Sequence, residues 1–102
     1  MPNKNYRIKL LKVAEDDFTE IVMYISAENI NAANKLADKI EKSLLSLTEN
    51  PKLGRIPRDE DIKQLGYRYL IVENYIIFYT IDQRTIYIHR ILHGSRNYKT
   101  IL

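Results

Sequence analysis

Three closely spaced β-type segments constrain the fold of this 102-residue chain more than any other feature. Residues rich in Tyr, Ile and Val occupy 67–72, 75–81 and 85–92, and only two or three residues separate each segment from the next. Connections of that length join antiparallel neighbours in hairpins. The C-terminal third therefore predicts a three-stranded antiparallel meander.

Two amphipathic helical patterns precede the meander. The first begins at the acidic group 15–17, where negative charge favours a helix start, and one face carries Ala14, Phe18, Ile21, Val22 and Ile25. Asn31 is the predicted N-cap of the second helix. That helix ends near Asn50, because Pro51 disfavours helical geometry in the residue before it. Its apolar stripe consists of Ala33, Leu36, Ala37, Ile40, Leu44 and Leu47.

A strand at residues 6–10, with alternating apolar positions, completes the set of elements. The order β-α-α-β-β-β predicts an α+β two-layer sandwich in a single domain, residues 1–102. An antiparallel helical hairpin packs on one face of a mainly antiparallel four-stranded sheet. Residues 52–66 are predicted to form a loop. The second face of the sheet is expected to be an uncovered trough, rich in tyrosine.

Composition excludes several classes of protein. Cysteine is absent, which rules out disulfides, thiolate nucleophiles and zinc–cysteine clusters. We expect neither a metal nor a cofactor. The start at residues 1–7 lacks the apolar stretch of a secretion signal, and the longest apolar run, residues 75–79, is far too short to span a membrane. These features predict a soluble cytoplasmic protein without a membrane partner.

Positive charge is concentrated in the second half of the chain. Residues 1–51 contain seven Lys and Arg against eight Asp and Glu, whereas residues 52–102 contain nine against five. From Gln83 onward there is no acid at all, and the positive and imidazole side chains are Arg84, His89, Arg90, His93, Arg96 and Lys99. This distribution predicts a C-terminal surface that engages nucleic acid or an acidic protein.

The ordered motifs resemble the RelE/ParE superfamily, the toxins of type II toxin–antitoxin pairs. The resemblance covers nearly the whole chain and depends on four motifs: Asn50-Pro51-x-x-Gly54, Tyr67-Arg68-x-Leu70-x-Val72, Asn74-Tyr75-x-x-Phe78-Tyr79-x-Ile81 and Arg90-Ile91-Leu92-His93-Gly94-x-Arg96. It implies a toxin that arrests growth and is neutralised by a cognate antitoxin. It also implies a macromolecular target, either DNA gyrase or the ribosome with its mRNA, and no small-molecule substrate.

One branch of this family cleaves mRNA on the ribosome, and the resemblance implies a catalytic set of Arg68, His93, Arg96 and Tyr98. The two arginines would clamp the phosphate, while His93 or Tyr98 would move protons. This chain departs from that branch at two positions. Ile76 follows the tyrosine of the central strand where an arginine is common, and Leu70 stands where a second basic residue is often found.

The other branch, which is ParE-like, inhibits DNA gyrase and needs no catalytic residue. The C-terminal motif resembles this branch more closely. It implies that the target-binding residues are Arg84, Arg90, Arg96 and Lys99. We therefore favour gyrase over the ribosome. A small RNA-binding or protein-binding module without toxicity is the third class left open.

Structural interpretations of the same residues also stay open at this point. Arg90 lies in register with apolar positions of its strand and is a candidate for a partly covered arginine, and Arg68 could pair with Glu73. His93 and Gly94 could form a strand exit in which the glycine has a positive φ and the imidazole caps nearby carbonyl groups. Tyr98 could pack the chain end onto the sheet.

Overall fold

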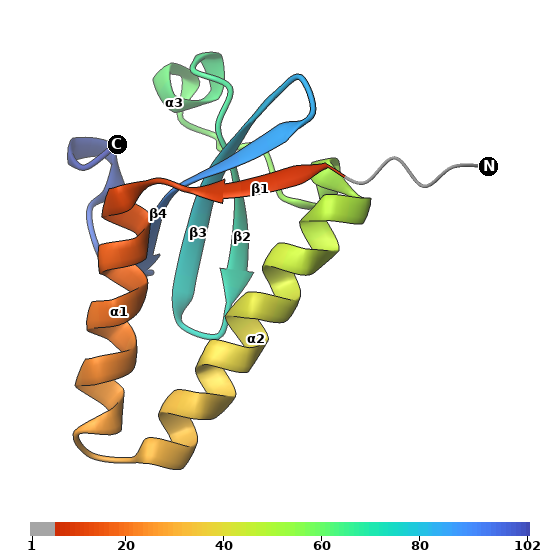
Figure 1. The fold of residues 1–102 in the computed structure, drawn as a ribbon. Coiled ribbons are helices and arrows are strands. Elements are labelled where there is room, and N and C mark those ends of the chain that lie inside the picture. Colours follow the sequence, from red (N-terminus) through yellow and green to blue (C-terminus); the bar gives the residue numbers. More distant parts are fainter. Residues whose placement is uncertain (1–5) are drawn as a thin grey trace.

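The computed structural model describes residues 6–102, and these form a layer of helices against a four-stranded sheet (Figure 1). The elements are β1 (Arg7–Leu10), α1 (Lys12–Ser26), α2 (Ile30–Glu49), α3 (Glu60–Gln64), β2 (Arg68–Val72), β3 (Tyr75–Asp82) and β4 (Thr85–His93), with 3₁₀ turns at Pro51–Leu53 and Tyr98–Thr100. The predicted two-layer α+β architecture is confirmed. The predicted domain and the predicted absence of a secretion signal include residues 1–5, which lie outside the described residues.

The sheet has the order β1-β4-β3-β2. Strands β2, β3 and β4 form the predicted antiparallel meander, whereas β1 joins β4 in parallel. The two hairpin turns contain Glu73 and Gln83, each with φ of 55°. Left-handed backbone at such positions matches the twist of the strands in tight hairpins.

The core lies between the helices and one face of the sheet. Helix α1 packs against β4, and α2 packs against β1 and β2. Fully or nearly fully buried residues in this layer are Ala14, Leu36, Ile40, Leu44, Leu47, Val72, Ile77, Tyr79, Ile86, Ile88 and Ile91. The N-cap of α2 is Asn29 rather than the predicted Asn31, because the side chain of Asn29 accepts a hydrogen bond from the backbone N–H of Ala32 at 3.0 Å. None of the helices in the described part of the chain is long and apolar enough to cross a bilayer.

The end of α2 is fastened to the sheet by the hydroxyl of Tyr79. This hydroxyl donates to the carbonyl of Pro51 and accepts from the backbone N–H of Gly54, both at 2.8 Å. Tyr79 is fully buried, and burial raises the pKa of its hydroxyl. A Cβ atom at Gly54 would lie 2.5 Å from the hydroxyl oxygen of Tyr79. The Asn-Pro-x-x-Gly motif thus ends α2 in a turn. The hydroxyl of Tyr79 fits between the carbonyl of Pro51 and the N–H of Gly54, where a side chain at position 54 would leave no room.

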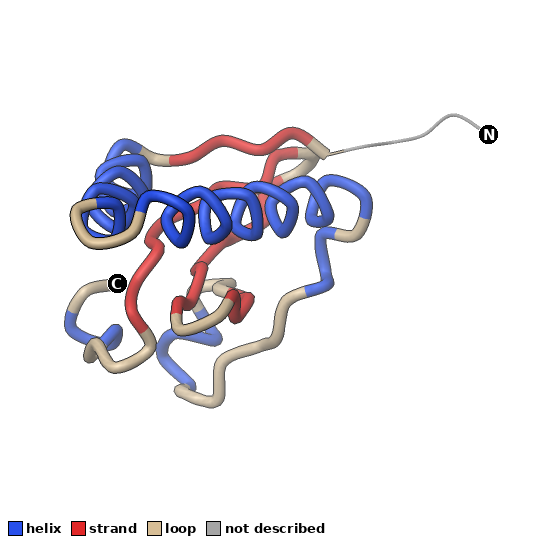
Figure 2. The backbone as a smooth tube through the Cα atoms, turned by 90° about the horizontal axis from the view of Figure 1, so that it is seen from below, coloured by secondary structure: helices blue, strands red, loops and turns tan. Residues whose placement is uncertain are grey.

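The second face of the sheet is partly covered, which corrects the expectation of an open trough. Residues 52–66 are not a plain loop, because they include α3, and Figure 2 shows this segment and the C-terminal end opposite the helical layer. Phe78, at the centre of this face, is only 1% exposed. The rings of Tyr67, Tyr69 and Tyr98 surround it, with centroids 5.1 to 6.4 Å away. The aromatic residues predicted for this surface therefore serve largely to seal it.

Candidate target-binding surface

An irregularity in β4 shapes the C-terminal part of the sheet. Phe78 of β3 pairs with Arg90, but the next residue, Tyr79, pairs with Ile88. His89 is thus an extra residue in β4, as in a β-bulge. Strand β1 pairs with β4 only as far as Ile88, so α1 rather than a strand lies against the rest of that edge.

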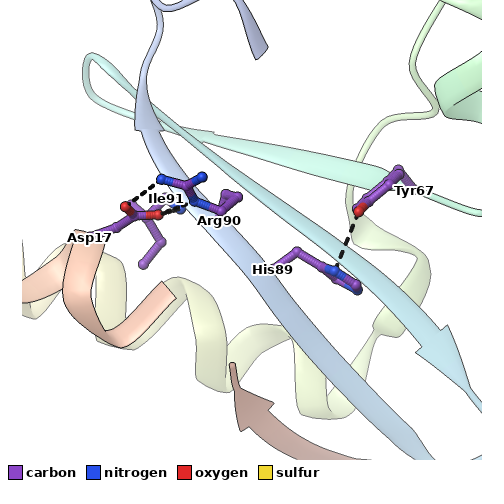
Figure 3. Close-up of polar contacts among 5 residues, drawn as sticks. All are labelled: Asp17, Tyr67, His89, Arg90 and Ile91. Atoms are coloured by element: carbon purple, nitrogen blue, oxygen red, sulfur yellow. Dashed lines mark hydrogen bonds and ion pairs between the residues drawn. The ribbon is translucent and has the colours of Figure 1, made fainter. Parts of the chain in front are cut away.

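Asp17 of α1 binds the edge of β4 that β1 leaves unpaired beyond Ile88 (Figure 3). Its carboxylate accepts from Nε and Nη2 of Arg90 at 2.7 and 2.8 Å, and from the backbone N–H of Ile91 at 3.0 Å. The side chain of Asp17 is 10% exposed, and that of Arg90 is 22% exposed. The hydrogen bond to Asp17 raises the pKa of Arg90. Arg90 was predicted to bind the target, yet its guanidinium is occupied within the monomer, in line with its structural interpretation.

Asp17 was missed as a partner, because the acidic group was interpreted as a helix start. A signal was present: Asp17 lies three residues after Ala14 and one before Phe18, which places it on the apolar stripe of α1. An acid at such a position is expected to have a partner, because an unpaired buried carboxylate is costly. The sequence does not reveal that the partner lies 73 residues away.

Two other predicted target-binding residues also have contacts within the chain. Lys99 forms an ion pair with Asp59 at 2.9 Å, and the hydrogen bond from Lys99 lowers the pKa of this carboxyl group. Asp59 also caps α3 by accepting from the N–H of Ile62, so the pair connects the C-terminal turn to α3. The guanidinium of Arg84 lies 4.8 Å from the centre of the Tyr6 ring. The concentration of positive charge is therefore partly neutralised.

Arg96 differs from these three residues. Among residues 6–102, its side chain has no hydrogen bond or ion pair, and it is exposed. It lines a pocket of about 380 Å³ between α1 and the end of β4. The other lining residues are Asp17, Glu20, Ile21, Tyr24, Tyr75, Ile91, Leu92 and His93. No acid lies near Arg96 in the C-terminal sequence, but the fold places Asp17 and Glu20 of α1 in the lining of the same pocket.

His93 is held by the turn that follows it. Its Nδ1 accepts a hydrogen bond from the backbone N–H of Ser95 at 3.1 Å, and the Ser95 hydroxyl is 2.8 Å from the same nitrogen. The ring also packs edge-on against Tyr75, with centroids 5.4 Å apart. Because Nδ1 is an acceptor, the neutral ring carries its proton on Nε2. Strand β4 does end at His93, as the strand-exit interpretation has it. However, Gly94 has no positive φ, and the ring of His93 accepts an N–H at Nδ1 instead of capping carbonyl groups.

The four residues predicted for catalysis occupy three separate places. Nη1 of Arg68 donates to the carbonyl of Gly54 at 3.1 Å, and the ring of Tyr98 packs on Phe78 across the second face. Only His93 and Arg96 share a pocket. Arg68 and His93 pair with opposite sides of β3, four residues apart. Standard strand dimensions then place their Cα atoms about 16 Å apart.

His89 is a packed residue of β4. Its two ring nitrogens lie 3.3 Å from the Tyr67 hydroxyl and 2.8 Å from the Thr80 hydroxyl (Figure 3 shows the first contact). Burial lowers the pKa of His89. Within residues 6–102 no three His, Cys, Asp or Glu side chains are grouped as metal ligands would be.

Comparison with known proteins identifies the family. The family model for the ParE toxin of type II toxin–antitoxin systems matches residues 8–98. The chain belongs to this family of toxins. A comparison with curated proteins found no match.

Two solved structures have the same fold as this ParE-family chain. One is the chromosomal ParDE toxin–antitoxin system from P. aeruginosa, with a TM-score of 0.70 and 21% identity, over 88% of this chain and 97% of that one. The other is the toxin–antitoxin complex RelBE2 from Mycobacterium tuberculosis, with a TM-score of 0.61 and 21% identity, over 90% and 94%. Both neighbours come from toxin–antitoxin systems.

Proposed function

We propose that this ParE-family toxin arrests growth by inhibiting DNA gyrase, and that a cognate antitoxin neutralises it. We choose gyrase as the target because the four predicted catalytic residues do not lie together. RNA cleavage needs a base, an acid and a positive clamp around one phosphate. Arg68, Tyr98 and the His93–Arg96 pair do not surround a common point.

The environment of His93 supports the same choice. A general base needs a lone pair directed at the substrate. In His93 the lone pair of Nδ1 is occupied by the N–H of Ser95, and Nε2 carries the proton. As arranged, this imidazole donates a hydrogen bond and is unsuited to accept a proton from a ribose hydroxyl.

One of the two departures from the nuclease pattern, Ile76, also has a structural consequence. Ile76 lines a pocket of about 240 Å³ on the second sheet face, together with Ile71 and Phe78. A phosphate in transfer needs positive charge around it. Among the residues that line this pocket, Arg58 alone is charged. The pocket is therefore better suited to an apolar group than to a phosphate.

An antitoxin partner is supported by the exposed apolar residues of the helical layer. Met23, Tyr24, Ile30 and Leu45 are each between 65% and 76% exposed. Apolar side chains in such number on two neighbouring helices suit a partner segment that folds as it binds.

The test begins with induced expression of the toxin in a bacterial host. We expect growth arrest, an SOS response and rescue by the product of the adjacent gene. Purified toxin should inhibit supercoiling by gyrase, and Lys42→Gln, which removes an exposed charge on α2, should act as the wild type does. Transcript cleavage in a ribosome-dependent assay, with gyrase unaffected, would overturn the proposal. Normal growth would instead indicate a non-toxic binding module.

A further inference from the structure

We propose that the turn at residues 93–96 binds a single carboxylate of the target protein, through the Nε2–H of His93 and the guanidinium of Arg96. This inference rests on the proposed function, because gyrase is the protein that would supply the carboxylate. It assigns His93 as a hydrogen-bond donor through Nε2 and Arg96 as its charged partner.

The donor role of His93 follows from its contacts. The backbone N–H of Ser95 can only donate, so Nδ1 must accept and the proton of the neutral ring lies on Nε2. The edge-on contact with Tyr75 fixes the ring plane. His93 is exposed and lines the pocket, so this N–H is available to a ligand without rearrangement of the turn.

Arg96 is brought to the same pocket by the same turn. Its backbone N–H donates to the carbonyl of His93 at 2.9 Å, which closes the turn and fixes the spacing between the two residues. Its guanidinium has no ion pair or hydrogen bond within residues 6–102. An unpaired guanidinium beside a fixed N–H donor is suited to a planar oxyanion such as a carboxylate.

The acids of α1 decide between a protein carboxylate and the DNA backbone. Asp17 and Glu20 also line this pocket. The Asp17 carboxylate is already paired with Arg90, which leaves the carboxylate of Glu20 in the lining with the guanidinium of Arg96. Each strand of a DNA duplex carries one negative charge per about 3.4 Å of helix axis, and its further phosphates would face Glu20. A lone carboxylate on a protein surface contacts the two donors without bringing further charges toward α1.

The first experiment uses the toxin alone and does not depend on gyrase. Nitrogen-15 NMR of the imidazole rings should show the Nε2–H tautomer for His93. Sodium acetate should shift the side-chain resonances of His93 and Arg96, whereas sodium chloride at equal ionic strength should not. An Nδ1–H tautomer, or no response to acetate, would overturn the assignment.

The second experiment measures binding to the gyrase subunits without DNA. We expect His93→Phe and Arg96→Gln each to weaken binding about tenfold, as for the loss of one hydrogen bond to a charged group. Lys42→Gln is the charge-matched control for Arg96→Gln and should bind as the wild type does. Circular dichroism and antitoxin binding should confirm that all three variants fold.

The outcomes separate the two proposals. If the wild type inhibits gyrase and Arg96→Gln binds equally well, the carboxylate site is wrong and gyrase inhibition stands. If Arg96→Gln weakens binding to a short DNA duplex more than binding to the subunits, the anion is a phosphate and the inference is overturned. If the wild type binds neither subunit, the proposed function fails, and the acetate experiment still tests the site.

Discussion

The carboxylate of Asp17 and the guanidinium of Arg90 form two hydrogen bonds, of 2.7 and 2.8 Å, across the contact between α1 and β4. The same carboxylate accepts the N–H of Ile91, where β1 no longer pairs with β4. One acid therefore neutralises a predicted target-binding arginine and replaces a missing strand partner. The helical layer and the C-terminal end of the sheet are joined through it.

We expect Asp17→Asn to lower the free energy of unfolding by about 3 kcal/mol, because it leaves a partly buried guanidinium without its counter-charge. Urea denaturation monitored by circular dichroism measures the change. Asp16→Asn is the matched control, since Asp16 forms an exposed pair with Lys12 and its loss should have little effect. Equal stability of the two variants would contradict the role given to Asp17.

Gly54→Ala should destabilise the fold by about 2 kcal/mol, as expected for overpacking of a filled site. The added Cβ would lie 2.5 Å from the hydroxyl oxygen of Tyr79 and 2.8 Å from the backbone oxygen of Tyr69, so both a buried side chain and a strand must move. Gly94→Ala is the control, because its nearest neighbour would lie at 3.4 Å. Thermal unfolding of the two variants compares them, and equal midpoints would refute the packing argument.

Tyr79→Phe should cost about 1–3 kcal/mol, because it leaves the carbonyl of Pro51 and the N–H of Gly54 without their partner. It also removes the atom nearest to the added Cβ of Gly54→Ala. The double variant should therefore be more stable than the sum of the single effects predicts. A double-mutant cycle from urea denaturation measures this coupling, and strict additivity would mean that the two sites are independent.

Stability should fall as the pH is lowered from about 7.5 to 5.5, because burial lowers the pKa of His89 in the folded state. Below the unfolded pKa of about 6.5, the unfolded chain binds a proton that the folded chain does not. His89→Gln should reduce this loss, measured as the free energy of unfolding at each pH. His93→Gln retains His89 and should retain its contribution. An unchanged pH profile for His89→Gln would contradict the assignment.

Local patterns in the sequence were sufficient for the four strands, the two long helices and their two-layer arrangement. The runs rich in Tyr, Ile and Val and the short connections of residues 67–92 predicted the meander, and the three-and-four spacing of apolar residues predicted both long helices. The short helix α3 was missed because five residues hold too little periodic signal. The N-cap of α2 was displaced by two residues, because Asn29 and Asn31 are both suitable caps and only backbone geometry selects one.

The sequence by itself determined that positive charge gathers in the C-terminal part and that the chain resembles a toxin family. Only the tertiary structure decided which of these charges remain available. Arg90 and Lys99 pair with Asp17 and Asp59, 73 and 40 residues away, whereas Arg96 reaches a pocket unpaired. The physical reason is that ion pairing depends on distance in space. The packing of α1 on β4 brings Asp17 to Arg90, and the segment that contains α3 brings Asp59 to the C-terminal turn. Local propensity carries no information about such contacts.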